Sequence, residues 1–232
     1  MRALFLPLCA TLLLPAAAQA APDPWEGVNR RIHGFNALAQ SYALAPAAAL
    51  WRAQVSAETR AGVGRVLANL GEPVTALSAV AAGDLSRAWN AARRFGINAT
   101  LGWGGWHDAA AERGLERQPL SPGDAACAWG LPSGPYLVLP LLGPSTLRDA
   151  GAALAANAAL AQGLGAAPVA GWQAGDAFLA YERAEPALTR LEAESLDAYA
   201  ALRSAWLQRR AAACPQDEAG VAAEDDAEPA PR

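Results

Sequence analysis

Four polar side chains recur at helical spacing in the first half of the chain, and their types suit the binding of a phosphate group. Steps of three and four residues place them on one face of a helix. A guanidinium presents a planar pair of N–H donors that matches phosphate oxygens. Two interpretations remain open: part of this face lines a polar path, or the whole face is solvated and held by an ion pair. The four residues are Arg87, Asn90, Arg94 and Asn98.

A further arginine stands beside Asp149 at the start of another expected helix. There the helix dipole favours the carboxylate of Asp149 and disfavours the guanidinium of Arg148. Arg148 therefore needs a partner of its own. We expect either a buried carboxylate, with Glu72 and Asp108 as candidates, or a lipid head group.

Two tryptophans, Trp103 and Trp106, enclose a pair of glycines in the middle of the chain. An indole ring has an apolar body and one N–H donor, so it suits both protein cores and membrane interfaces. A core position and an interface position both remain open. The glycines, which expose the backbone there, strengthen the case for the interface.

Residues for bond-breaking chemistry are sparse. The chain has two histidines, His33 and His107, and neither is close in sequence to Ser133 or Ser145, the serines beside glycine and proline. No G-x-S-x-G nucleophile turn occurs, and the histidines and cysteines lack the spacing of metal ligands. A net charge of −4 argues against a nucleic-acid partner. We expect no catalytic residues, no metal, no cofactor and no nucleic acid.

An apolar run between Gly-Pro corners spans residues 134–149 and leads directly into a helix start. Water solvates such a loop poorly, whereas lipid solvates it well. We expect its leucines to contact a membrane or to line the mouth of a channel. These leucines are Leu137, Leu139, Leu141 and Leu142.

The elements that must position these residues are helical. Capping residues and apolar periodicity predict an all-α fold of seven to nine helices, with one short extended segment around Tyr136–Leu139. Residues 116–132 are expected to form a loop, and residues 106–113 a short helical turn. The expected N-caps are Asp23, with Pro24 at the first helical position, Ser56, Asp84 or Ser86, and Thr146. The expected helices span residues 24–38, 46–51, 57–69, 73–83, 86–98, 147–164, 171–183 and 186–213.

Both ends of the chain differ from this helical region, expected over residues 21–213. Residues 1–20 have the positive start, short apolar core and Ala18-Gln19-Ala20 cleavage site of an export signal. Residues 214–232 are acidic and aromatic-free, which predicts a disordered tail. In an oxidising compartment, Cys127 and Cys214 either form a disulfide or remain two free thiols. No purely apolar run after the signal is long enough to cross a bilayer.

Several segments, in chain order over roughly residues 23–210, resemble the sequence signature of the MlaA family, also called VacJ. Residues 23–30 are similar to its D-P-x-E-x-x-N-R opening, and residues 69–73 to its N-L-x-E-P. Residues 94–108 and the apolar run of residues 134–149 are similar to its central segments. The motif residues in these segments are Asp23, Pro24, Asn29, Arg30, Asn69, Glu72, Pro73, Asp108, Gly134, Pro135, Tyr136, Pro140 and Asp149.

The resemblance implies a ring of helices embedded in the inner leaflet of the outer membrane, with a central amphipathic channel. It implies a non-enzymatic protein that removes mislocalised phospholipid from the outer leaflet and passes it to a soluble periplasmic carrier, maintaining lipid asymmetry beside a trimeric porin. Arg94, Asn98 and Arg148 are then candidates for the polar path or its support. The apolar-run leucines, Trp103 and Trp106 are candidates for membrane contact. Leu139→Asp is expected to impair lipid transfer with little loss of helix.

Two other functions remain as alternatives: a structural protein that scaffolds a porin complex without moving lipid, and an envelope hydrolase that acts on lipid. One departure from the family affects membrane anchoring. Family members commonly carry a lipidated cysteine after the signal core, whereas Cys9 lies too early and has leucine before it. Without an acyl anchor, membrane residence depends on apolar helix faces.

Overall fold

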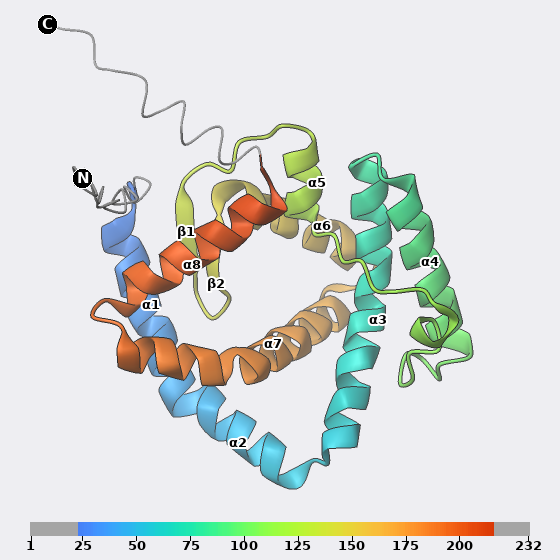
Figure 1. Cartoon of the computed structure of the whole chain (residues 1–232), viewed down its shortest axis with the longest axis horizontal. Helices are drawn as coiled ribbons and strands as arrows, with labels where there is room; N and C mark the ends of the chain where they lie inside the picture. Colours follow the sequence, from blue (N-terminus) through green and yellow to red (C-terminus); the bar gives the residue numbers. More distant parts are fainter. Residues whose placement is uncertain (1–22, 216–232) are drawn as a thin grey trace, which may run out of the picture.

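Side-chain caps start five of the helices. The computed structural model describes residues 23–215, and these form eight α-helices, which confirms the all-α class (Figure 1). The caps predicted at Ser56, Asp84 and Thr146 each accept a hydrogen bond from the backbone N–H three residues later. They begin α3 (Ala57–Ala81), α4 (Leu85–Thr100) and α6 (Leu147–Leu164).

The remaining elements complete a chain that bends round the molecule. It starts with α1 (Glu26–Ala39), a π-helical turn (Gln40–Leu44) and α2 (Ala45–Gln54). Between α4 and α6 come a 3-10 turn (Ala111–Arg113), α5 (Pro122–Ala128) and the strands β1 (Tyr136–Leu139) and β2 (Gly143–Thr146). The last helices are α7 (Ala166–Glu194) and α8 (Ala198–Ala213).

The helices are arranged around a common centre rather than in layers. Figure 1 shows α1, α2 and α3 following one another along the outside, while α7 crosses the interior and α8 starts beside α1 and runs over the hairpin towards α5. Helix α4 packs along α3, α7 packs against both α2 and α3, and α5 packs between α3 and α6. Helix α3 therefore contacts three other helices and is the main support of the fold.

Helix α1 holds the β-hairpin with two asparagine side chains. Asn29 Nδ2 donates to the carbonyl of Tyr136 at 3.0 Å, and Asn29 Oδ1 accepts from the N–H of Val138 at 2.9 Å. Asn36 makes the same two kinds of bond to Leu139 and Leu141. Asn29 and Asn36 are seven residues apart, a rise of about 10 Å along the helix. Their partners Tyr136 and Leu139 are three residues apart, which is also about 10 Å along a strand. The two asparagines thus replace a third strand at the edge of β1.

Two predicted helix ends are wrong, and both lie at proline. Helix α3 continues through Pro73 and α7 continues through Pro186. A proline removes one helical hydrogen bond and strains the turn before it. In both helices the preceding glutamate is tied to another helix: Glu72 accepts from Arg94 at 2.9 Å, and Glu185 pairs with Arg52 at 2.8 Å. These contacts between helices hold the turn in place.

Further boundaries differ from the predictions. The helix expected over residues 186–213 is interrupted between Glu194 and Ala198, and β2 is a second strand where one extended segment was expected. The predicted loop over residues 116–132 contains α5, which starts with a reciprocal capping box between Ser121 and Asp124. The helical turn expected over residues 106–113 is reduced to the 3-10 turn. Helix α1 begins at Glu26, because Asp23 uses its Oδ1 to accept from the N–H of Trp25 and from Asn29 Nδ2.

Cys127 and Cys214 form a disulfide with a Cα–Cα distance of 6.2 Å, so the paired alternative is correct. The bond attaches the residue after α8 to α5. The predicted export signal of residues 1–20 lies outside the described residues, as does most of the predicted acidic tail. Residues 23–215 contain no helix with the combined length and hydropathy of a membrane-crossing segment.

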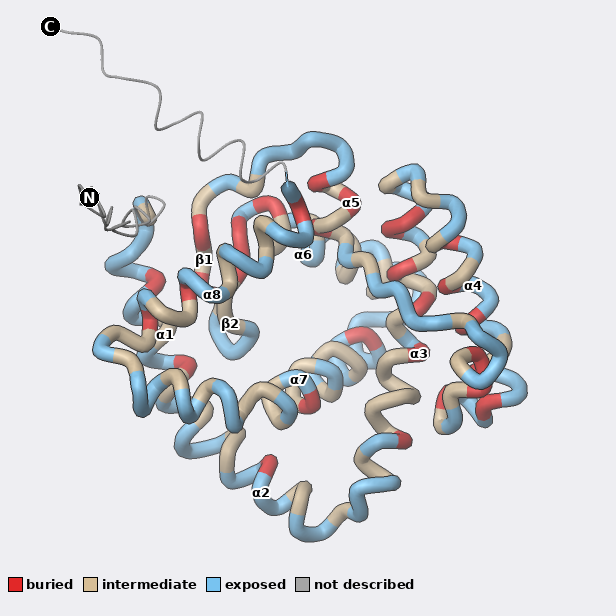
Figure 2. Tube along the Cα trace, viewed as in Figure 1, coloured by how far each residue is buried: buried red, intermediate tan, exposed pale blue. Residues whose placement is uncertain are grey.

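The distribution of polarity is inverted relative to a water-soluble helical protein. On α1, Val28 and Phe35 are exposed, whereas Asn29 and Asn36 are buried. On α4, Leu85, Trp89 and Phe95 are exposed while Arg94 and Asn98 are buried. Figure 2 shows how small the buried part of each helix is. One cluster of buried apolar side chains consists of Tyr136, Val138 and Tyr199, with Ile32, Trp206 and Leu207 packed against them.

Candidate functional site

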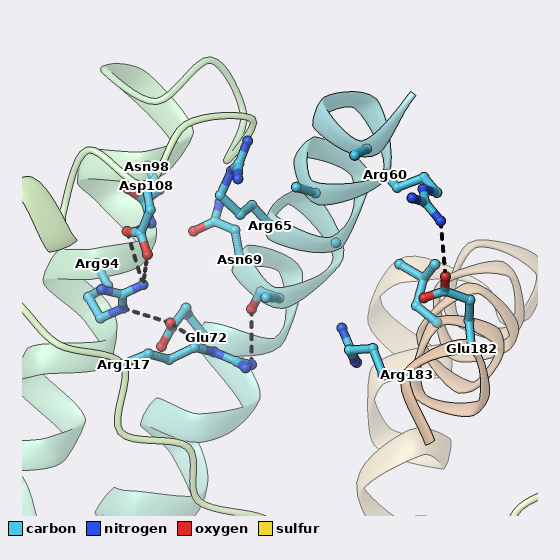
Figure 3. A pocket seen from close by; sticks show the side chains of 15 residues that line it. Arg60, Arg65, Asn69, Glu72, Arg94, Asn98, Asp108, Arg117, Glu182 and Arg183 are labelled. Atoms are coloured by element: carbon cyan, nitrogen blue, oxygen red, sulfur yellow. Dashed lines mark hydrogen bonds and ion pairs between the residues drawn. The ribbon is translucent and has the colours of Figure 1, made fainter. Parts of the chain in front are cut away.

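One face of α3 lines a cavity of about 520 Å³, which we call the α3 trough (Figure 3). The face recurs at steps of three and four residues and spans residues 57–72, about 22 Å of helix. Small residues alternate along it with polar ones, so the backbone is open between the polar side chains. The α3 residues are Ala57, Arg60, Ala61, Gly64, Arg65, Ala68, Asn69 and Glu72.

Arg94 of α4 organises one wall of the trough. Its Nε donates to Glu72 Oε1 at 2.9 Å, its Nη2 donates to both oxygens of Asp108, and its Nη1 donates to the carbonyl of Leu115. Asn98 donates to Asp108 Oδ1 at 3.0 Å and accepts from a backbone N–H. Only 2% of Arg94 is exposed. Of the two interpretations left open for this face, the solvated one is therefore wrong at Arg94 and Asn98, which belong to a buried network.

The network sets the charge of its carboxylates. Burial alone would raise the pKa of Asp108, but hydrogen bonds from Arg94, Asn98 and a backbone N–H outweigh it and lower that pKa below its ordinary value. Asp108 is therefore ionised at neutral pH. Its negative charge compensates the positive charge of Arg94, so this part of the wall can remain charged although it is buried.

The opposite wall is formed by α7. Arg60 on α3 donates to Glu182 at 3.2 Å, and Leu179 and Arg183 complete the lining. In Figure 3, Arg183 extends from α7 towards α3, and it makes no ion pair with any residue in the described range 23–215. The trough thus contains a guanidinium available to an anion.

The trough carries an excess of positive charge. Its lining includes five arginines, at positions 60, 65, 94, 117 and 183, against three carboxylates, an excess of two charges. Arg65 uses its Nε to donate to the carbonyl of Trp106 at 2.7 Å and has no acidic partner among residues 23–215. The excess therefore falls on Arg65 and Arg183, which favour an anionic group.

Two buried oxygens of the α3 face lack hydrogen-bond partners within the described chain: Asn69 Oδ1 and Glu72 Oε2. Both residues are almost fully buried. An unpaired buried acceptor is costly, so these positions favour a donor from a ligand. The trough accordingly offers donors for an anion and acceptors for a cation or hydroxyl.

Arg148 lies in the first turn of α6, outside the trough, so the expectation that it pairs with Glu72 or Asp108 is wrong. Arg94 pairs with these two carboxylates instead. Arg148 Nε donates to Asp149 at 3.0 Å and its Nη1 to the carbonyl of Leu131 at 3.0 Å. It also contacts Cys214 Sγ at 3.7 Å. Arg148 thus supports the disulfide region, outside the trough.

The apolar-run leucines lie on the hairpin. Leu137 and Leu139 are half-buried on β1, whereas Leu141 and Leu142 at the tip are 58% and 66% exposed. Trp103 is 75% exposed, and its backbone has φ +55°, a strained value for a non-glycine residue. Trp106 is half-buried against Gly62, where an added Cβ would come within 2.6 Å of the ring. Only some of these residues are thus available to an apolar phase, and membrane contact remains a prediction.

The motif residues outside the trough connect distant parts of the chain. Arg30 makes two hydrogen bonds to Asp197, the N-cap of α8, at 3.0 and 2.7 Å. Asp23 accepts from the hydroxyl of Tyr199, and Asp149 accepts from Arg210 at 3.1 Å. Pro135 and Pro140 bracket β1, and Gly134 has φ +66°. These residues stabilise the fold around the trough.

Sequence reasoning missed Arg60, Arg65, Glu182 and Arg183 as lining residues. A signal was present, because positions 57–72 alternate small and polar residues at helical spacing. Arg60 and Arg65 lie within the expected helix of residues 57–69, so this pattern was visible there. Glu182 and Arg183 lie on α7, and no local pattern indicates that α7 packs against α3.

A second cavity, of about 540 Å³, is apolar and lies between α3, α5 and α6. Leu77 and Trp129 are exposed at it, and Trp129 Nε1 donates to the carbonyl of Ala81 at 2.5 Å. Residues 23–215 hold no group of three or more His, Cys, Asp or Glu side chains placed for a metal ion.

Comparison with known proteins matches residues 21–213 to the model of the MlaA lipoprotein family. Among similar proteins, the "intermembrane phospholipid transport system lipoprotein MlaA" of Escherichia coli K12 is 34% identical over 159 residues, 65% of this chain and 63% of that protein. The protein of the same name from Haemophilus influenzae is 31% identical over 131 residues, 55% of this chain and 52% of that protein. The matches thus span between half and two thirds of these relatives' lengths.

A solved structure agrees with the sequence matches. It comes from work on the "structural basis for maintenance of bacterial outer membrane lipid asymmetry" and superimposes with a TM-score of 0.74 at 31% identity, covering 83% of this chain and 99% of that chain. The sequence match runs through the trough, the hairpin and α8 alike. The chain belongs to the MlaA lipoprotein family.

Proposed function

We propose that this protein moves phospholipid at the periplasmic side of the outer membrane without breaking a bond. It takes lipid misplaced in the outer leaflet and passes it to a soluble periplasmic carrier, which maintains the asymmetry of the membrane. Relatives named as parts of an intermembrane phospholipid transport system support this proposal, as does the similar structure from work on lipid asymmetry.

The inverted polarity is the observation that carries the proposal. Exposed leucines and aromatics recur on α1, α3, α4 and α6, while asparagines, arginines and a glutamate are buried. In water, such an exterior would leave apolar surface unfavourably hydrated. In the acyl-chain region of one leaflet the same exterior is favourable, and the polar interior can hold a head group away from hydrocarbon.

The α3 trough is the proposed path for the head group. Its length of about 22 Å exceeds one leaflet of a hydrocarbon core about 30 Å thick, so it can connect the membrane interior to the aqueous side. Arg65 and Arg183 supply the uncompensated positive charge that a phosphate needs. The acyl chains remain on the apolar side, where the cavity between α3, α5 and α6 offers a second apolar surface.

The hairpin tip is the proposed membrane contact. Leu142 is more exposed than Leu139, which pairs with Gly143 in the sheet. A substitution at Leu142 therefore tests the contact with less risk to folding. Leu142→Asp should lower the fraction of protein that floats with phospholipid vesicles. The partition free energy should become less favourable by up to about 3 kcal/mol. Leu142→Ile is the matched control, because it keeps the apolar area. Equal flotation of the two variants would contradict this placement.

Lipid transfer between vesicles tests the function itself. The protein is reconstituted in donor vesicles holding a labelled phospholipid, and transfer to acceptor vesicles is followed with a soluble lipid-binding carrier present. Arg65→Gln with Arg183→Gln should reduce transfer about tenfold or more, since the phosphate loses its cations. Arg93→Gln with Arg190→Gln, exposed arginines outside the trough, should leave transfer unchanged.

The same experiment separates the alternatives. A protein that binds vesicles and a porin trimer but transfers no lipid would be a scaffold, and the proposal would fail. Transfer with the label recovered in intact phospholipid supports transport, whereas cleaved lipid would indicate the hydrolase.

A further inference from the structure

Glu72 lies at the end of the polar face of α3, and only one of its two carboxylate oxygens accepts a hydrogen bond from the described chain. Its residue is 1% exposed, and its Oε1 accepts from Arg94 Nε at 2.9 Å. Its Oε2 has no hydrogen-bond partner in the part of the chain that the structure describes. Asn69 Oδ1, one helical turn earlier on the same face, is likewise without a donor. Two buried acceptors, on residues that both line the trough, thus lack hydrogen-bond donors within the described chain.

Arg117 covers Glu72 loosely. Its Nε lies 3.5 Å from Glu72 Oε1, and its Nη2 donates to the carbonyl of Ala68 at 3.5 Å. Both distances are at the outer limit of a hydrogen bond. The side chain is 43% exposed and comes from the irregular segment between Arg113 and α5. By contrast, Arg94 is buried and held at short distances, so Arg117 is the guanidinium that can leave.

We infer that the α3 trough recognises a phospholipid head group with a primary ammonium next to the phosphate, as in an ethanolamine phospholipid. The ammonium donates to Glu72 Oε2 and Asn69 Oδ1, and Arg117 moves from Glu72 to the phosphate. This inference rests on the proposed function, because it assumes that the trough is the path of the head group.

The exchange leaves the charges of the site balanced. Before it, Glu72 faces Arg94 and Arg117. After it, Glu72 faces Arg94 and the ammonium, while the phosphate faces Arg117 and the uncompensated Arg183. Only a head group that carries both charges can make this exchange. Its ammonium replaces the guanidinium of Arg117 at Glu72, and its phosphate then binds that guanidinium.

Other common head groups lack one of these features. A choline ammonium has three methyl groups and no N–H, so it would leave both acceptors unpaired. A glycerol head group has hydroxyl donors but no positive charge to replace Arg117 at the carboxylate. Sites built to hydrogen-bond a ligand group discriminate strongly against analogues that lack it.

The wild-type protein tests the inference without a substitution. Donor vesicles carry labelled phosphatidylethanolamine, phosphatidylcholine or phosphatidylglycerol with identical acyl chains, and the transfer rates are compared at equal protein insertion. We expect the ethanolamine lipid to move at least about tenfold faster than the choline lipid, and faster than the glycerol lipid. Equal rates for ethanolamine and choline lipids would overturn the inference and leave the proposed function intact. A glycerol lipid as fast as the ethanolamine lipid would overturn the role of the ammonium, and absence of all transfer would refute the function.

Two variants locate the selectivity. Glu72→Gln and Arg117→Gln should each lower the ratio of ethanolamine to choline transfer towards one. Arg117→Gln is the safer variant, because Glu72→Gln also removes the charge opposite Arg94. Arg113→Gln is the matched control: it belongs to the same connection, lines no part of the trough and donates to a backbone carbonyl. An unchanged ratio in folded Arg117→Gln would overturn the exchange.

Discussion

Arg94 shows how a single residue holds a charged interior together. It bridges Glu72 on α3 and Asp108 in the connection after α4, with little exposure to water. A buried ion pair adds little stability relative to an apolar replacement of both partners. Removing one partner is different, because it leaves a buried charge without compensation.

Arg94→Met should therefore lower the free energy of unfolding by about 3–5 kcal/mol. Denaturation of the detergent-solubilised protein, followed by circular dichroism, measures this change. Arg93→Met, the neighbouring exposed arginine on α4, should stay within about 0.5 kcal/mol of the wild type. If the two variants are equally stable, the Arg94 network does not stabilise the fold.

Arg30 and Asp197 provide a residue-scale contact with a pH dependence. Two hydrogen bonds from Arg30, with one from the backbone N–H of Ala200, lower the pKa of Asp197 from 3.8 to about 2. A carboxylate whose pKa is lower in the folded state stabilises that state at pH values above the unfolded pKa. This contribution is lost as the pH falls from about 4 through about 2.

NMR titration of the Asp197 carboxyl should accordingly give a midpoint near pH 2 in the wild type. Arg30→Gln should return the midpoint towards 3.8, because the guanidinium donors are gone. Arg31→Gln, an exposed arginine on the same helix, should leave it unchanged. A wild-type midpoint near 3.8 would show that the contact is not maintained.

At the scale of elements, α3 has two faces with different surroundings. Its polar face lines the trough, and the glycine at position 62 lets Trp106 approach the helix closely. Gly64, two residues later, faces the open trough, where an added Cβ would meet only Leu179 Cδ1 at 3.8 Å. The two glycines therefore have different reasons to be small.

Gly62→Ala and Gly64→Ala should have opposite effects on the free energy of unfolding. The first places a methyl group within 2.6 Å of the Trp106 ring and should destabilise by about 1–3 kcal/mol. The second meets ordinary contact distances and should stabilise by about 0.4–1 kcal/mol through the lower entropy of the unfolded chain. Thermal denaturation of both variants measures the difference, and equal shifts would contradict the packing of Trp106 on α3.

For the whole molecule, contacts distant in sequence replace a large apolar core. Arg30 and Asp197 join α1 to the start of α8, and the Cys127–Cys214 disulfide joins its end to α5. Arg210 pairs with Asp149 at 2.8 Å beside this disulfide. Helix α8 is thereby fastened at both ends, which closes the arrangement of helices in Figure 1.

Reduction of the disulfide should lower the free energy of unfolding by about 2–5 kcal/mol, because it releases a constraint over 87 residues of chain. Chemical denaturation with and without reductant measures the change. The variant with both cysteines replaced by serine should be as unstable as the reduced protein and insensitive to reductant. If reductant has no effect on the wild type, the disulfide is not a stabilising contact.

Sequence alone determined the features that depend on a few neighbouring residues. The caps at Ser56, Asp84 and Thr146 lie within three residues of the N–H groups that they accept from. The extended segment Tyr136–Leu139 has the β-branched and aromatic residues typical of a strand. The trough residues Arg94 and Asn98 were also found, because their helical spacing and chemistry are local properties.

Only the tertiary structure decided which faces are buried, where α3 and α7 end, and what Arg148 contacts. Pro73 and Pro186 do not end their helices, because Arg94 and Arg52 on other helices hold the glutamates before them. Val28 and Phe35 of α1 face outwards because Asn29 and Asn36 bind a hairpin more than a hundred residues away. Periodicity indicates that a helix has two faces, but the choice between them depends on what lies against each face. Which face is buried is therefore decided by the free energy of the assembled molecule in its surroundings.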